Sequence, residues 1–188
     1  MNAEAESRGP HGARSRPRGS AFTLLEILVT LGVIAVLAGL ALPAYQRVLE
    51  RGRTAACVSH LRQLGAALSL YLGENNNVMP TLKEGREKIA DQEPVIDNTL
   101  DRYVKEKSVF ACPSDKVWVQ RAGTSYGWNV ALNGQSLGSL NFFGVVQDLS
   151  RIPVLADKEG FHAYSQSKVN VLYADGHASN EVSFFAGQ

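Results

Sequence analysis

The side chains that could do chemistry in this chain are few and lie far apart. Cys57 and Cys112 are the only thiols among 188 residues, too few for a disulfide-dense mini-protein or a zinc site with four thiolates. In an exported chain we expect them to form a bridge, which adds about 3–4 kcal/mol to the free energy of unfolding in the chain-entropy model. The alternative is two buried free thiols, because Cys57 lies on an apolar stripe.

The other polar residues do not form a recognisable metal-binding or catalytic pattern. Two histidines and two aspartates have suitable ligand atoms, and they are His162, His177, Asp157 and Asp175. Their spacing matches no standard metal motif, so we expect them at the surface, with Asp175 serving as a turn residue. Ser125 and Ser179 have no histidine or aspartate partner at a recognisable spacing, and there is no glycine-rich phosphate loop. We therefore expect no catalytic residue, no metal site and no enzyme activity.

Composition narrows the possible classes of protein further. Hydrophobic residues make up 45% of the chain and charged residues 20%, which fits one folded domain with an appendage. The 19 basic residues nearly balance the 18 acidic ones, giving a net charge of +1. A dedicated nucleic-acid binder normally shows a basic excess, so we expect no nucleic-acid partner.

A basic leader and an apolar segment open the chain. Residues 1–21 hold four arginines and almost no large apolar side chain, whereas residues 22–45 carry one ionisable group before the final tyrosine, Glu26. A helix of these 24 residues is long enough, at about 1.5 Å per residue, to cross a hydrocarbon core of about 30 Å. Because the arginines all precede the segment, the positive-inside rule predicts a cytoplasmic N-terminus with the rest of the chain outside.

Two other interpretations of the apolar segment remain open. A buried core helix is one, although apolar character on every side is unusual in a small chain. A cleavable secretory signal is the other, with a cut after Ala44. The uninterrupted apolar stretch from Ile27 to Leu42 is long for such a signal. A signal peptide also does not explain why a carboxylate, Glu26, stands near the front of the apolar block, where it is costly to insert into a membrane.

The order of residues around Glu26 resembles the type IV prepilin family, which includes the pseudopilins of type II secretion systems. The order is a basic leader, the small residue Ala21, the segment Phe22-Thr23-Leu24-Leu25-Glu26, an apolar helix and then Pro43. The resemblance implies cleavage by a prepilin peptidase between Ala21 and Phe22, followed by N-methylation of Phe22. Glu26 is then the fifth mature residue and Pro43 the twenty-second, as in the family. The residue before the cut is usually glycine there and is Ala21 here.

The resemblance also implies a function and a set of partners. The chain would be a structural subunit of a secretion or pilus filament, assembled through its N-terminal helix. Its partners would be copies of itself or sibling pilins, the prepilin peptidase, and an inner-membrane assembly platform with a cytoplasmic ATPase. No cofactor is implied, although some pseudopilin heads bind calcium. The alternatives are a minor tip pilin that binds a surface or substrate through loops around 75–125, and a membrane-anchored exported domain that forms no filament.

Glu26 has a physical reason to be part of assembly. Cleavage creates a positive α-amino group at Phe22, and both charges would be costly to bury alone. A carboxylate of one subunit can pair with the amine of its neighbour, which would set the register between subunits. The alternative is a carboxylate that reaches the lipid headgroups near the start of the helix.

A second helical pattern follows the apolar segment. Its apolar residues recur at spacings of four and three, and they are Cys57, Leu61, Leu64, Leu68 and Leu72 with Tyr71. The polar residues Arg53, Ser59, Arg62, Gln63 and Ser69 lie on the opposite face. One helix is therefore predicted from about Phe22 to about Leu72, with Gly39 and Pro43 as weak points and a stop at Gly73.

The remainder of the chain predicts a β-rich head with long loops. Helical turns are expected near 100–104, and strands near 125–132, 142–146, 153–156 and 169–173. The pair Asp175-Gly176 predicts a type I′ turn that leads into a strand over 177–185. The segments 57–68, 109–115, 125–129 and 169–177 resemble a pseudopilin subgroup with a C-terminal Asp-Gly hairpin.

These patterns together predict an α+β, type IV pilin-like fold. A long N-terminal helix, half transmembrane and half amphipathic, packs on a small antiparallel sheet. We expect a cleaved leader at 1–21, a transmembrane and polymerisation helix at 22–45, an amphipathic helix at 46–74 and a globular head at 75–188.

Overall fold

The structure is a computed structural model that describes residues 22–142, 144, 146–163 and 167–180. The chain divides into two units with their boundary between Leu42 and Pro43. The expected leader, including Ala21, lies outside the described residues, as does the end of the strand expected over 177–185.

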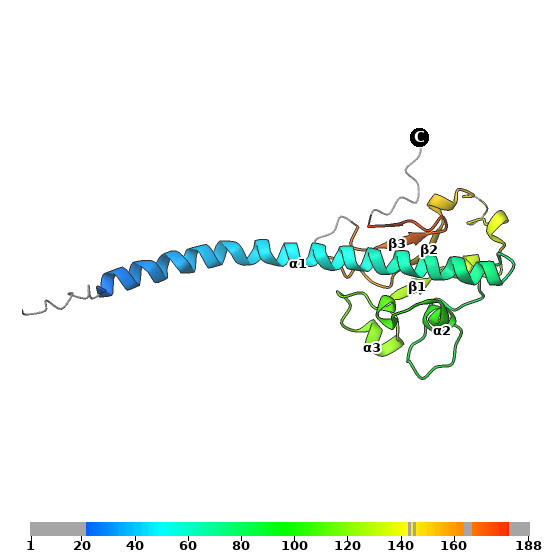
Figure 1. Ribbon diagram of the computed structural model, residues 1–188, viewed down its shortest axis with the longest axis horizontal. Coiled ribbons are helices and arrows are strands. Elements are labelled where there is room, and N and C mark those ends of the chain that lie inside the picture. The colour runs from blue at the N-terminus through cyan, green and yellow to red at the C-terminus, as the bar shows by residue number, and fades with distance from the viewer. Residues whose placement is uncertain (1–21, 143, 145, 164–166, 181–188) are drawn as a thin grey trace, which may run out of the picture. The chain divides into compact units, whose positions relative to one another are not determined.

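A single helix of 51 residues, α1 (Leu24–Glu74), comes first among the described elements (Figure 1). It continues through Gly39 and Pro43, the two weak points expected from the sequence. Because proline lacks an N–H, the carbonyl of Gly39 has no donor from the helix backbone four residues on. The helix ends one residue beyond the predicted stop, and Asn76 and Asn77 beyond its end take left-handed φ angles of 54° and 56°.

The C-terminal part of α1 packs on the head along the predicted stripe. Buried residues recur every three or four positions, and they are Glu50, Thr54, Cys57, Leu61, Leu64, Leu68 and Leu72. The polar residues expected on the opposite face, from Arg53 to Ser69, are exposed. The sequence therefore correctly predicted both the helix and the face that it buries.

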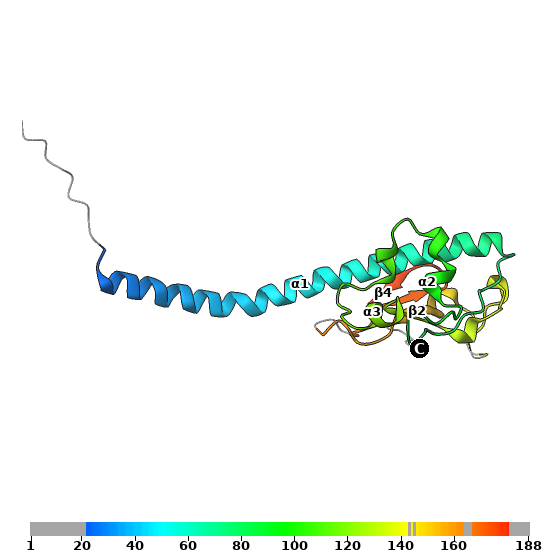
Figure 2. The same ribbon diagram turned by 90° about the horizontal axis from the view of Figure 1, so that it is seen from below.

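The head contains one antiparallel sheet in the order β1-β2-β3-β4. Its strands are β1 (Tyr126–Trp128), β2 (Pro153–Asp157), β3 (Val171–Tyr173) and β4 (Ala178–Ser179). Figure 2 shows β2, β4, α2 and α3 gathered beside the C-terminal part of α1. This arrangement confirms the predicted α+β, type IV pilin-like fold.

Short helices lie between α1 and β1 and between β1 and β2. The α-helical ones are α2 (Ile96–Thr99) and α3 (Trp118–Ala122). The 3₁₀ turns are Asp101–Tyr103, Lys107–Phe110, Val130–Leu132, Leu137–Ser139 and Leu149–Arg151. The helical turns expected near 100–104 correspond to α2 and the turn after it.

One predicted strand is shorter than expected, and another was wrong. The strand expected over 125–132 ends at Trp128, because the Asn129 side chain accepts a hydrogen bond from Ala131 N and caps a 3₁₀ turn. In the described residues of 142–146 there is only an isolated antiparallel bridge between Phe142 and Val146. Both segments have apolar composition typical of strands, but local turn chemistry decides their backbone.

The Asp-Gly hairpin is present with a different turn. Tyr173 N donates to His177 O, and Gly176 N donates to Tyr173 O, so three residues form the loop. Gly176 has a φ of +90°, whereas Asp175 is not among the residues with positive φ, as a type I′ turn would require. The loop is a type I turn followed by a left-handed glycine, and the predicted type I′ turn was wrong.

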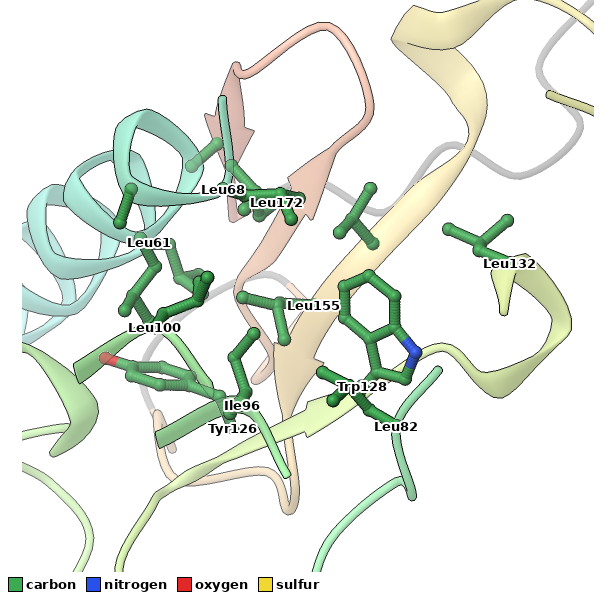
Figure 3. Packing of buried hydrophobic residues seen from close by; sticks show 14 of the residues in the cluster. Leu61, Leu68, Leu82, Ile96, Leu100, Tyr126, Trp128, Leu132, Leu155 and Leu172 are labelled. Atoms are coloured by element: carbon green, nitrogen blue, oxygen red, sulfur yellow. The ribbon is translucent and has the colours of Figure 1, made fainter. Parts of the chain in front are cut away.

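The core lies between α1 and the sheet (Figure 3). Leu61 and Leu68 of α1 point toward Leu172 of β3, and Leu155 of β2 lies between this group and Trp128. A Cβ at Gly65 would come within 3.0 Å of Leu172 Cδ1, so glycine permits the close approach of helix and strand.

Candidate functional site

The apolar segment of α1 is exposed along its whole length. Every residue from Phe22 to Leu49 is exposed, including large side chains such as Leu24 at 85% and Leu40 at 71%. Leaving this much apolar surface in water would be very unfavourable, because each fully buried leucine contributes roughly 1.5–3 kcal/mol. By length and composition the segment could cross a membrane, and exposed apolar surface of this extent is typical of a site that contacts lipid or protein.

Glu26 lies in the first turn of α1. Its backbone N–H donates to Thr23 Oγ1 at 3.2 Å, which makes Thr23 the N-cap of the helix. The spacing Thr23-x-x-Glu26 is that of a capping box, in which the glutamate favours the helix N-terminus. Within the described residues, the Glu26 carboxylate takes part in no ion pair. This capping role was not among the predictions, although the Thr23-x-x-Glu26 spacing is visible in the sequence.

A buried disulfide joins α1 to the head. Cys57 and Cys112 are bonded across 55 residues, and their exposed fractions are 0% and 2%. Cys112 follows the 3₁₀ turn Lys107–Phe110, and its backbone N–H donates to Ser125 Oγ at 2.9 Å. The bridge therefore attaches the helix to the loop that leads into β1.

His162 lies beside this disulfide and is completely buried, so its expected surface position was wrong. Its Nδ1 lies 3.0 Å from Glu50 Oε1 and 3.1 Å from Thr54 Oγ1. Its Nε2 lies 3.5 Å from Asp157 Oδ2 and 3.4 Å from Cys112 Sγ. Asp157 is likewise buried, against expectation, because as the last residue of β2 its side chain faces the interior.

The two carboxylates alter the acid–base behaviour of this cluster. Burial alone would lower the pKa of His162, but hydrogen bonds and charge attraction from Asp157 and Glu50 outweigh it, so the pKa is raised. Burial would raise the pKa of Glu50, but hydrogen bonds from Ser114, His162 and Arg53 outweigh it, so that pKa is lowered. Both directions favour an imidazolium held between carboxylates.

Helix α1 contributes three residues to this cluster, because their spacing places them on one face of the helix. Glu50, Thr54 and Cys57 follow one another at spacings of four and three, so they extend the stripe of Leu61 and Leu64 toward the N-terminus. Asp157 is oriented by hydrogen bonds to its Oδ2 from the Asn170 backbone at 2.8 Å and side chain at 3.0 Å. The sequence held one signal for this cluster: Glu50 and Thr54 are polar, yet they continue the spacing of the apolar stripe.

Ser125 has an aspartate partner that its sequence spacing did not reveal. Its hydroxyl donates to Asp115 Oδ2 at 2.6 Å while it accepts from Cys112 N. Asp115 also accepts from the backbone N–H groups of residues 117, 118 and 119 at the start of α3. Burial alone would raise the pKa of Asp115, but these hydrogen bonds outweigh it and the pKa is lowered. The pair braces the Cys112 loop.

Asp175 and His177 lie at the surface, as expected. Asp175 Oδ1 accepts from His177 N at 3.0 Å and lies 2.6 Å from His177 Nδ1. The His177 ring stacks on Tyr173, with ring centres 4.4 Å apart. These contacts stabilise the hairpin loop, and Asp175 contributes through the hydrogen bond that its side chain accepts from His177 N.

Comparison with known proteins agrees with this geometry. Residues 16–42 match the family model described as the prokaryotic N-terminal methylation motif. This match covers the end of the leader and the exposed apolar segment up to the unit boundary.

Two curated relatives extend the similarity into the head. The chain is 33% identical over 103 residues to the type II secretion system core protein G of Escherichia coli, covering 55% of this chain and 68% of that protein. It is 30% identical over 142 residues to the protein of the same name from Pectobacterium carotovorum subsp. carotovorum, covering 76% of this chain and 82% of that protein. No solved structure gives a significant match.

Proposed function

Because the chain belongs to the family of type II secretion system core protein G, we propose that it is cut between Ala21 and Phe22 and then joins a secretion filament through its apolar helix. The chain is a type IV pilin-like pseudopilin, a structural subunit that prepilin peptidase processes and that assembles with sibling pilins. The family relatives are structural proteins, and we propose that this head likewise catalyses no reaction.

One observation carries this proposal. The apolar segment over residues 22–45 is exposed on every side and begins immediately after the expected cut. A secretory signal would be discarded after cleavage, whereas a cut before Phe22 keeps the whole segment in the mature protein. Removing the leader therefore leaves a helix whose first residues are free to enter a bundle of identical segments.

The location follows from the same segment. Anchoring in the inner membrane fits the apolar helix and the family. We propose that the leader lies in the cytoplasm and the head outside, because four arginines precede the segment. This orientation also suits a buried disulfide in the head, since disulfides persist outside the cytoplasm. An assembly platform driven by a cytoplasmic ATPase would then extract the subunit from the membrane.

Glu26 would set the register of assembly. After cleavage, the α-amino group of Phe22 and the carboxylate of Glu26 lie about one helical turn apart along one chain, so an axial stagger brings the amine of one subunit to the carboxylate of the next. Unit charges at 4 Å interact by about 4 kcal/mol at an effective dielectric near 20, although desolvation cancels much of this. The pair therefore selects the stagger more than it adds stability.

Mass spectrometry of the mature N-terminus tests the proposal. Protein extracted from membranes of cells that contain a prepilin peptidase should begin at an N-methylated Phe22. The variant Ala21→Leu should remain inserted and uncut, because a large side chain replaces the small residue at the cut, whereas Ala21→Gly should be cut at least as fast. A mature N-terminus at Tyr45 would show a secretory signal, and an intact leader would show a simple anchor.

One observation favours the minor tip pilin as a second candidate. A hollow of about 580 Å³ lies in the head, lined mainly by residues within the loops where the sequence placed a binding surface. Its lining includes Arg86, Trp118, Arg121 and Lys158, the last two with their cations 5.4 and 5.3 Å from the Trp118 ring centre. The abundance of the subunit in purified filaments decides between the roles, since a tip protein is rare and a major subunit abundant.

A further inference from the structure

The disulfide and His162 form a group with the chemistry of a metal site. Cys57 Sγ, Cys112 Sγ and a ring nitrogen of His162 all lie within 4.8 Å of one another, and all three residues are buried. Two thiolates and an imidazole are a common ligand set for zinc. The cysteines are oxidised here, so the question is what the same residues do while they are still thiols.

The distances around His162 Nε2 are those of a tetrahedral site. With Zn–S bonds of about 2.3 Å and Zn–N or Zn–O bonds of about 2.0–2.2 Å, neighbouring ligand atoms lie roughly 3.3–3.7 Å apart. His162 Nε2 lies 3.4 Å from Cys112 Sγ and 3.5 Å from Asp157 Oδ2. These two separations match edges of such a tetrahedron, and Cys57 Sγ lies within 4.8 Å of the ring nitrogen, so binding would require the sulfurs to separate and Cys57 to adjust.

The second side of the imidazole is arranged as it is in zinc proteins. A zinc-bound histidine usually donates its other N–H to a carboxylate, which fixes the ring and its tautomer. Here Nδ1 faces Glu50 Oε1 at 3.0 Å, and Ser114 Oγ donates to the same oxygen at 2.7 Å. Asp157 is in turn oriented by Asn170. Zinc would displace the proton from Nε2, which lies 3.4 Å from Cys112 Sγ, while Nδ1 keeps its proton for Glu50.

We propose that the dithiol form of this chain binds one zinc ion through Cys57, Cys112, His162 and Asp157, and that disulfide formation expels the ion. A sulfur in a disulfide has no thiolate charge to donate, so the bridge and the metal exclude each other. The site would hold the two cysteines together, with the head packed on α1, before the bridge forms. It does not depend on whether the mature chain enters a filament.

The exchange between the two states balances with a disulfide oxidant. The two zinc-bound thiolates lose two electrons in total and form the S–S bond, and Zn²⁺ leaves without a change of charge. The oxidant disulfide accepts the two electrons and takes two protons from water to become two thiols. Zinc lowers the nucleophilicity of the thiolates by sharing their electrons, so it should slow the exchange.

The test uses the full-length chain in detergent. The protein is reduced by a phosphine without oxygen, unfolded, and refolded with Zn²⁺ or with Co²⁺ as a coloured probe, since the closed head offers an ion little access. We expect one ion per reduced chain by native mass spectrometry, with thiolate-to-cobalt charge-transfer absorption, and no ion bound by the oxidised chain. Oxidation by oxidised glutathione should be about tenfold slower when zinc is bound.

Matched variants identify the ligands. His162→Asn should weaken zinc binding by at least about tenfold, whereas His177→Asn, at the exposed histidine, should leave it unchanged. Glu50→Gln keeps all four ligands and should weaken binding by about 10- to 100-fold, so it serves if His162→Asn does not fold. The proposal is overturned if the reduced chain binds no more zinc than the oxidised chain. It is also overturned if folded His162→Asn or Glu50→Gln binds as tightly as the parent.

Discussion

The two parts of α1 differ in what covers them, although they belong to one helix. Residues Phe22–Leu49 are exposed on every side, whereas from Glu50 onward one face is buried against the head. The first part is apolar all round as far as Tyr45, whereas the second is apolar only along a stripe. A helix with one apolar stripe finds its partner within its own chain, but a helix that is apolar on all sides requires lipid or other subunits. Glu50 therefore marks the boundary between the part of α1 that packs on its own head and the part that is available for assembly.

Glu26→Ala should give the largest effect and should leave the head unchanged. The variant should still insert, because the segment becomes more apolar, and should still be cut, but filament yield should fall by at least about tenfold. Quantifying sheared filaments against membrane-bound subunit measures this ratio. Assembly at normal efficiency would contradict the pairing role.

Glu26→Gln distinguishes pairing from helix capping. Glutamine can complete a capping box but carries no charge to pair with the amine of a neighbouring Phe22. If pairing sets the register, Glu26→Gln assembles as poorly as Glu26→Ala. Recovery of assembly by Glu26→Gln would assign the function of Glu26 to the Thr23 cap instead.

Leu61→Ala tests the buried side of the comparison. Leu61 is 0% exposed in the core, so the substitution should lower the free energy of unfolding of the head by about 2–5 kcal/mol. Leu70→Ala is the matched control on the same helix, because Leu70 is 59% exposed and should change stability by less than about 0.5 kcal/mol. Denaturant unfolding in detergent measures both. Equal effects would mean that the stripe does not organise the head.

The bridge between Cys57 and Cys112 should be present in the exported protein. Peptide mapping without reduction should recover the linked pair, and Cys57→Ser should lower the free energy of unfolding by about 2–4 kcal/mol. The loss should be confined to the head, leaving membrane insertion intact. Both thiols freely alkylated in protein from the cell envelope would contradict this prediction.

Asp115→Asn should give the smallest effect and one that depends on pH. The pKa of Asp115 is lowered in the folded head, so its carboxylate adds stability above its unfolded value of 3.8, which is lost as the pH falls through the folded value. We expect a loss of about 1–3 kcal/mol at neutral pH that shrinks below pH 3.8. Thermal unfolding at a series of pH values measures the difference. A constant difference down to strongly acid pH would show that the charge is unimportant.

The sequence predicted those features that depend on local periodicity. The stripe from Cys57 to Leu72 and the helix end follow from residues close together in the chain; the stripe was correct, and the helix ends at Glu74, one residue beyond the predicted stop at Gly73. The cluster around His162 could not be predicted in this way, because His162 lies 112 residues from Glu50 and they meet only after the head folds. The predicted type I′ turn at Asp175-Gly176 was wrong for a local reason, because an Asp-Gly pair is compatible with both a two-residue and a three-residue hairpin loop.

The position of the disulfide has a mechanical consequence. Cys57 lies two helical turns beyond Glu50, near the N-terminal end of the contact between α1 and the head. A force that pulls on the N-terminal part of α1 reaches the head first at this end of the contact. Such a force would tend to separate the helix from the head one contact at a time. Once the polar contacts of Glu50 and Thr54 yield, a covalent bond placed there carries the load, so the leucines beyond it are protected from peeling. The head is thus attached most firmly where traction during extraction from the membrane would be greatest.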